Sequence, residues 1–86
     1  MEDRETRLKR LRLRSWRRGI KEMDLIFGNF ADVHLADLTP AQLDAHEALM
    51  SEADQDLYQW VSGQMDIPAE FQDAVALVQS KIWMGS

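Results

Sequence analysis

Residues 17–30 read RRGIKEMDLIFGNF, and the spacing of their apolar side chains decides the fold class. These side chains recur at intervals of three and four, so an α-helix over about 18–30 would place them on one face. The apolar set is Ile20, Met23, Ile26, Phe27 and Phe30. The same spacing returns elsewhere in the chain, and alternation never persists over the length of a strand. The sequence therefore predicts an all-α fold.

Four further helices are expected from this periodicity, at about 6–17, 40–51, 54–62 and 68–83. The helix at 40–51 has the best-marked start, because Thr39 can serve as N-cap, Pro40 suits the first helical position and Gln42 completes a capping box. Gly63 should stop the fourth helix, and residues 31–38 should form a loop. Because the connections are short, successive helices should pack as neighbours. We expect a small compact five-helix bundle, one domain over residues 1–86 with its core at about 5–83.

The apolar positions of these helices predict the core. The side chains expected to be mostly buried are Ile20, Met23, Ile26, Phe27, Phe30, Leu43, Leu57, Trp60, Phe71, Val75 and Val78. The stripe of the last helix continues to Ile82. The chain has no cysteine, so this packing has to supply the stability without disulfides.

Charge is distributed unevenly along the chain. Residues 1–21 contain nine basic and three acidic side chains (+6), residues 22–86 contain Lys81 and twelve acidic side chains (−11), and the two sums give −5. A basic end on an acidic body favours an oriented approach to a partner. It disfavours a nucleic-acid-binding domain, which usually has a basic balance. No apolar run approaches the ~20 residues that cross a bilayer, so membrane insertion is not expected.

The sequence contains no pattern typical of an active site or a metal centre. It has no glycine-rich phosphate loop, no G-x-S-x-G motif and no histidine–carboxylate spacing of the kind that holds metals. His34 is expected in a solvated loop, and His46 on a partly buried helix face. We therefore expect no catalytic residue, no metal ligand and no enzymatic activity.

The polar side of the helix at 18–30 carries the candidate contact residues. On a helical wheel, Arg18, Glu22, Leu25 and Asn29 lie opposite the apolar face. An Arg18–Glu22 ion pair would stabilise the helix by only ~0.2–0.5 kcal/mol. Gly19 inside the helix would cost up to ~1 kcal/mol relative to alanine, so helix stability does not explain it. Two explanations remain open: a bend or close packing between the first two helices, or a place where a partner's backbone or a ligand approaches.

These residues also carry a resemblance to a known family. Arg18-Gly19-x-x-Glu22, followed by Met23-Asp24, resembles the signature of the succinate dehydrogenase assembly factors that promote covalent flavinylation. The similarity covers about residues 5–82 and includes Leu38-Thr39, which opens the middle helix. It also includes Asp54-Gln55-Asp56-Leu57-Tyr58-Gln59-Trp60, in the place of the family's DPDLxxW-like stretch. Gln55 departs from the family pattern, since many members have a proline there, but a proline at a helix start is replaceable.

The resemblance implies a five-helix protein that is not itself an enzyme. It implies binding to the flavoprotein subunit of succinate dehydrogenase, or in some bacteria of fumarate reductase, and help in attaching FAD to a histidine of that subunit. FAD would belong to the partner, and this chain would bind no cofactor stably by itself. Carried over by position, Arg18, Gly19 and Glu22 would form the contact, with Leu25 and Asn29 beside them. The factor would act by aligning histidine and flavin.

Two rival classes stay open at this point. The basic first helix is compatible with a small nucleic-acid-binding helical protein, and bacterial relatives have also been proposed as antitoxin-like interaction proteins. Mitochondrial members of the family carry a targeting extension that is not found here, so we expect a bacterial, cytoplasmic member. We also expect the free chain to be a monomer.

Overall fold

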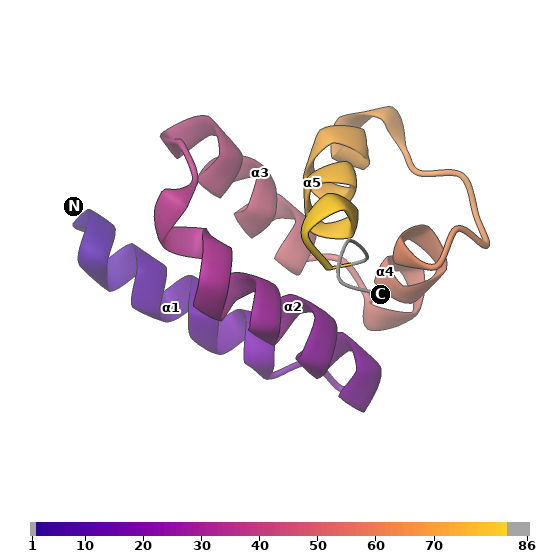
Figure 1. The fold of residues 1–86 in the computed structure, drawn as a ribbon, viewed down its shortest axis with the longest axis horizontal. Helices are drawn as coiled ribbons and strands as arrows, with labels where there is room; N and C mark the ends of the chain where they lie inside the picture. Colours follow the sequence, from indigo (N-terminus) through magenta and orange to yellow (C-terminus); the bar gives the residue numbers. More distant parts are fainter. Residues whose placement is uncertain (1, 83–86) are drawn as a thin grey trace.

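Five α-helices and two 3₁₀ turns form the chain over residues 2–82, the part that the computed structural model describes (Figure 1). The elements are α1 (Arg4–Trp16), α2 (Lys21–His34), η1 (Leu35–Asp37), α3 (Pro40–Met50), α4 (Asp54–Val61), η2 (Ala69–Phe71) and α5 (Gln72–Ile82). No strand occurs within these residues, so the predicted all-α class is confirmed. None of the described helices is long and apolar enough to cross a membrane.

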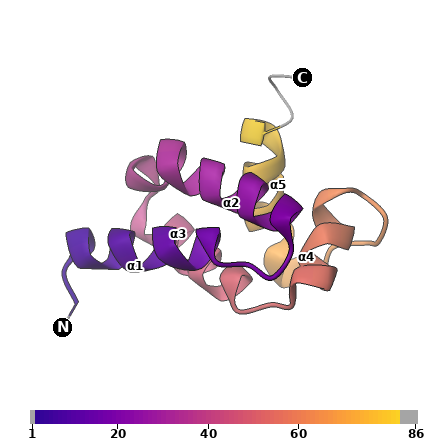
Figure 2. The same cartoon turned by 90° about the horizontal axis from the view of Figure 1, so that it is seen from below.

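The first two helices lie antiparallel and side by side (Figures 1 and 2). In this pair the indole of Trp16 covers Gly28, a buried residue in the middle of α2. A Cβ atom on Gly28 would lie 2.3 Å from Cδ2 of the indole, which is far inside van der Waals contact. Trp16 Nε1 also donates a hydrogen bond to Asp32 Oδ1 at 3.1 Å. The glycine that close packing of these helices requires is therefore Gly28, which the sequence analysis did not single out.

The second helix is shifted toward the C-terminus relative to its prediction. It begins at Lys21, after Ile20 in an extended conformation (φ −119°, ψ 129°), so Arg18 and Gly19 precede it. It continues to His34 and passes directly into η1, so the loop expected at 31–38 is wrong. The physical reason is that the apolar stripe does not stop at Phe30. The stripe goes on through the buried Ala31, Leu35 and Leu38.

Local signals placed several other boundaries correctly. Thr39 caps α3, since its Oγ1 accepts from Gln42 N at 3.1 Å while Gln42 Oε1 accepts from Thr39 N at 2.9 Å. Gly63 follows the end of α4 with φ +81°, as a helix-stopping glycine does. The helix expected from about Pro68 begins as α5 at Gln72, after the turn η2. Its predicted end at Trp83 and the side chain of Ile82 lie outside the described residues.

The core lies between the α1–α2 pair and α3, α4 and α5. Nine of the eleven residues predicted for it are buried, and Ile20 and Ile26 are only partly buried. Ile20 is less covered because it precedes α2, and Ile26 because it lies beside a surface groove. The core also contains residues beyond the predicted set: Leu11, Ala31, Leu35, Leu38, Leu49, Met50, Val61 and Ala74.

Candidate partner-binding surface

Arg18 is held inside the molecule by residues at the end of α3, in the link that follows it and at the start of α4. Its Nε donates to Asp54 Oδ1 at 2.6 Å, its Nη1 to the carbonyl oxygen of Met50 at 2.8 Å and its Nη2 to the carbonyl oxygen of Glu52 at 2.8 Å. All three guanidinium nitrogens are therefore occupied, and only 10% of the side chain is exposed. The predicted Arg18–Glu22 ion pair is wrong, because Arg18 precedes the helix and pairs with Asp54. Figure 2 shows the α1–α2 link passing close to the start of α4.

Gly19 is bound to the same carboxylate. Its backbone N–H donates to Asp54 Oδ2, and the N–H of Arg18 donates to Asp24 Oδ1 at 2.6 Å. A Cβ atom on Gly19 would lie 3.2 Å from Asp54 Oδ2, closer than ordinary contact. The glycine is therefore explained in part by the nearness of Asp54. Gly19 itself is exposed, so its outer side is accessible to a partner. We call the arrangement of Arg18, Gly19, Asp24 and Asp54 the Arg18 clasp.

The outer face of α2 presents a mixed polar and apolar stripe. Glu22, Leu25 and Asn29 are exposed along it, and Val33 extends it by one more turn. Leu25 is 47% exposed and Val33 is 66% exposed, and both side chains line the same surface groove. The sequence analysis missed Val33 because it ended the helix at Phe30. We call Glu22, Leu25, Asn29 and Val33 the α2 stripe.

A shallow groove of about 350 Å³ runs beside this stripe. Its lining residues are Leu25, Ile26, Asn29, Phe30, Val33, His34 and Lys81. Of the predicted contact residues, the fold therefore brings Glu22, Leu25 and Asn29 onto one face and leaves Gly19 exposed just before that helix. It separates Arg18 from them, because the arginine side chain turns inward to Asp54.

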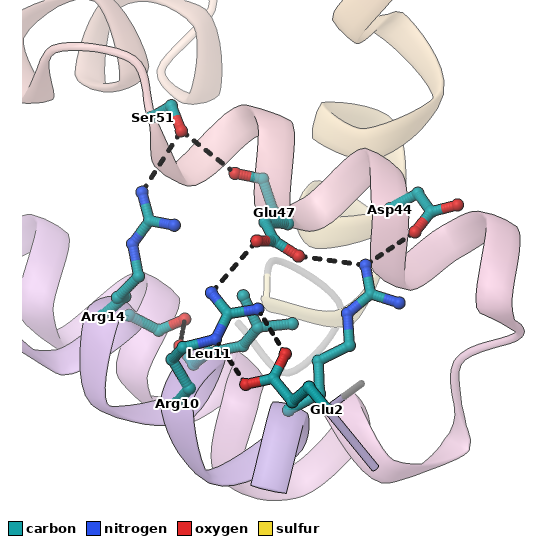
Figure 3. A network of polar contacts seen from close by, with 9 residues as sticks. Glu2, Arg10, Leu11, Arg14, Asp44, Glu47 and Ser51 are labelled. Carbon is teal, nitrogen blue, oxygen red and sulfur yellow. Dashed lines mark hydrogen bonds and ion pairs between the residues drawn. The ribbon is translucent and has the colours of Figure 1, made fainter. Parts of the chain in front are cut away.

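The basic helix α1 is paired with acidic α3 within the fold, as Figure 3 shows. Arg7 Nη2 contacts Asp44 Oδ1 at 2.6 Å and Glu47 Oε1 at 3.0 Å, and Arg10 Nη1 contacts Glu47 Oε2 at 3.0 Å. The hydrogen bond from Arg10 lowers the pKa of Glu47 most, and the hydrogen bond from Arg7 lowers it further. Arg14 donates to Ser51 Oγ at 3.2 Å. Much of the basic charge that the sequence analysis assigned to a partner is thus neutralised internally, which also leaves fewer cations for nucleic-acid phosphates.

His46 is a core residue. Its Nε2 lies 3.0 Å from Ser15 Oγ, and Ser15 in turn donates to the carbonyl oxygen of Leu11 at 2.8 Å. The imidazole stacks on Phe30 with a centroid distance of 5.5 Å, and desolvation lowers the pKa of His46 to about 4. The hydroxyl–imidazole pair is sealed, with exposures of 0% for Ser15 and 3% for His46, so no substrate can reach it.

His34 lies at the end of α2 and not in a solvated loop. It is partly buried, and its ring centroid is 5.7 Å from that of Phe30. Among residues 2–82 there is no group of three or more His, Cys, Asp or Glu side chains that could hold a metal ion. The surface features of the described chain are an exposed stripe, a shallow groove and a fixed Arg-Gly segment.

Comparison with known proteins confirms the family resemblance of the sequence. A family model described as flavinator of succinate dehydrogenase matches residues 9–81. Relatives named mitochondrial succinate dehydrogenase assembly factor 2 include one from Meyerozyma guilliermondii, 42% identical over 66 residues, covering 77% of this chain and 49% of the relative. Another, from Dictyostelium discoideum, is 35% identical over 72 residues, covering 83% of this chain and 51% of the relative. No solved structure matches the chain.

The chain spans about half the length of the curated relatives that it matches first. These relatives are named as mitochondrial, which contradicts the cytoplasmic location expected from the sequence, so that prediction is wrong. The family match itself covers most of the chain and includes α2, the Arg-Gly segment and the α3–α4 link. The chain belongs to the family of flavinators of succinate dehydrogenase.

Proposed function

We propose that this chain is an assembly factor that binds the flavoprotein subunit of succinate dehydrogenase and promotes the covalent attachment of FAD to it. The observation that carries this proposal is the match of residues 9–81 to a family described by that activity. The names of the relatives, which are succinate dehydrogenase assembly factors, support it.

The contact surface in this proposal consists of Gly19 and the α2 stripe. Apolar side chains gathered on one exposed patch are typical of surfaces that bind another protein, and Leu25 and Val33 both line the groove beside α2. Glu22 and Asn29 would supply the polar contacts, and Gly19 would allow the partner to come close. Arg18 would contribute indirectly, because its guanidinium is committed to Asp54, Met50 and Glu52.

FAD belongs to the flavoprotein in this proposal, and this chain binds no cofactor of its own. The chemistry of a second groove supports that division. This groove, about 520 Å³ between α3 and α5, is lined by Ala41, Gln42, Ala45, Asp73, Ala74, Ala76, Leu77 and Ser80. These lining residues include an acidic side chain and no basic one, so they would not attract the pyrophosphate of FAD. The factor would instead hold the flavoprotein so that histidine and flavin are aligned, and orientation of this kind can accelerate a reaction strongly without a catalytic group.

The test is complementation in cells that lack their own factor. Covalent flavin on the flavoprotein is read by in-gel fluorescence, and co-purification reports binding. Leu25→Asp should abolish both signals, whereas Leu13→Asp, on a leucine of similar exposure in α1 (51% against 47%), should preserve them. Circular dichroism has to show that both variants are folded. Normal flavinylation with folded Leu25→Asp would refute the proposed surface, and failure of the unchanged chain to flavinylate would refute the function.

A further inference from the structure

The start of α2 is fixed in an unusual way. Its N-cap residue, Ile20, has no side chain that can accept a hydrogen bond from the helix. Two carboxylates instead hold the backbone just before the helix, since Asp24 accepts from the N–H of Arg18 and Asp54 from the N–H of Gly19. The position of the first turn of α2 therefore depends on groups outside the usual capping position.

Asp54 is the component of the clasp that comes from a distant part of the chain. It is the first residue of α4, where the N-cap Ala53 provides no side-chain hydrogen bond. Both carboxylate oxygens of Asp54 are used on the α1–α2 link, Oδ1 by Arg18 Nε and Oδ2 by the Gly19 N–H. Its side chain is 17% exposed and that of Arg18 is 10% exposed, so water competes weakly for these bonds.

We propose that Asp54 is a positioning residue for partner binding. This inference rests on the proposed function, because it concerns the same surface. Without the carboxylate, the Nε of Arg18 and the N–H of Gly19 lose their partner, and the link before α2 gains freedom. Gly19 and Glu22 would then have to be ordered when the flavoprotein binds, and that ordering weakens affinity. Asp54 thus acts through the backbone of the Arg-Gly segment, without touching the partner.

The matched pair of variants is Asp54→Asn and Asp56→Asn. Both remove one negative charge from the first turn of α4, so their effects on the helix dipole are similar. Only Asp54 belongs to the clasp, since Asp56 is exposed. Asparagine keeps the size of Asp54, but its amide NH₂ cannot accept a hydrogen bond, so one of the two donors loses its present acceptor.

The dissociation constant for the purified flavoprotein subunit of succinate dehydrogenase is measured at a temperature where both variants are folded. Asp54→Asn should raise it at least about tenfold, and Asp56→Asn should leave it within about twofold. Amide hydrogen exchange, followed by NMR, should show faster exchange of the Gly19 N–H in Asp54→Asn only. Combining Arg18→Lys with Asp54→Asn should weaken binding little further, because both changes break one unit.

If Asp54→Asn does not fold, Asp54→Glu replaces it, since this variant keeps the charge and moves the carboxylate by one methylene. It should also bind more weakly than the unchanged chain. The inference would be overturned if Asp54→Asn is folded and binds as well as the unchanged chain. The same result with Asp54→Glu, where that variant replaces Asp54→Asn, would also overturn it. Unfolding of both variants would overturn it as well, since Asp54 would then serve the fold itself. Absence of binding by the unchanged chain would overturn the proposed function instead.

Discussion

Replacing Gly28 by alanine tests the packing of the first two helices. The added methyl would lie 2.3 Å from Cδ2, 2.5 Å from Cε2 and 2.5 Å from Cε3 of Trp16. Carbon atoms pack at about 3.5–4.0 Å, so the indole would have to move by more than 1 Å. That movement also endangers the hydrogen bond from Trp16 Nε1 to Asp32.

The expected change in the free energy of unfolding combines two destabilising contributions and one stabilising contribution. Overpacking costs ~1–3 kcal/mol, and loss of the Trp16–Asp32 hydrogen bond costs ~0.5–1.5 kcal/mol. Alanine favours the helix over glycine by up to ~1 kcal/mol, which offsets part of this cost. We expect a net destabilisation of ~1–3 kcal/mol, which for a domain of this size lowers the melting temperature by roughly 5–20 °C.

Urea denaturation and thermal melts followed by circular dichroism measure this change. Asn29→Ala, at the neighbouring exposed position of α2, is the control and should raise stability by a few tenths of a kcal/mol. In a double-mutant cycle, Trp16→Leu should relieve most of the cost of Gly28→Ala, because the smaller side chain leaves room for the methyl. If Gly28→Ala is as stable as the unchanged chain, or more stable, the close approach of Trp16 is not what requires glycine.

Two further predictions concern stability. Thr39→Ala removes the capping box of α3 and should cost ~1 kcal/mol in urea denaturation, with an unchanged denaturant slope. The folded state lowers the pKa of His46 from 6.5 to about 4, so between these pH values the unfolded chain binds more protons at this group. Stability should therefore fall as the pH drops from 6.5 toward 4, by up to ~3 kcal/mol, while above 6.5 the group adds no pH dependence. Melts across this range should show the decline in the unchanged chain and a much weaker one in His46→Gln, and equal declines would refute the assignment to His46.

Features that depend on neighbouring residues could be predicted from the sequence. The capping box at Thr39 and the stop at Gly63 each involve only a few consecutive positions, so the pattern contains all the information. The core followed from helical periodicity for the same reason. The end of α2 was misplaced because the polar residues Asp32 and His34 interrupt a stripe that nevertheless continues through Ala31 and Leu35.

Contacts between distant residues could not be predicted in this way. The partner of Arg18 is 36 positions away, and no helical wheel relates a link residue to the start of another helix. The same limit explains why the sequence analysis considered close packing at Gly19 and not at Gly28, since a wheel shows where Gly28 points but not what covers it. The sequence signal that could have indicated close helix packing was the presence of two small residues, Gly28 and Ala31, next to the apolar stripe.

The Arg18 clasp also has a consequence for the order of folding. Each helix can form from local contacts, but the clasp joins the α1–α2 link to the start of α4, 36 positions further along the chain. Closing a flexible loop of this length costs about 3 kcal/mol of chain entropy, so the contact becomes favourable only after the intervening helices have shortened the path. A chain with all its helices formed but its links still apart would lack the fixed Arg-Gly segment. The segment is therefore arranged only in the finished molecule, and an incompletely folded copy would not present the surface proposed to bind the flavoprotein.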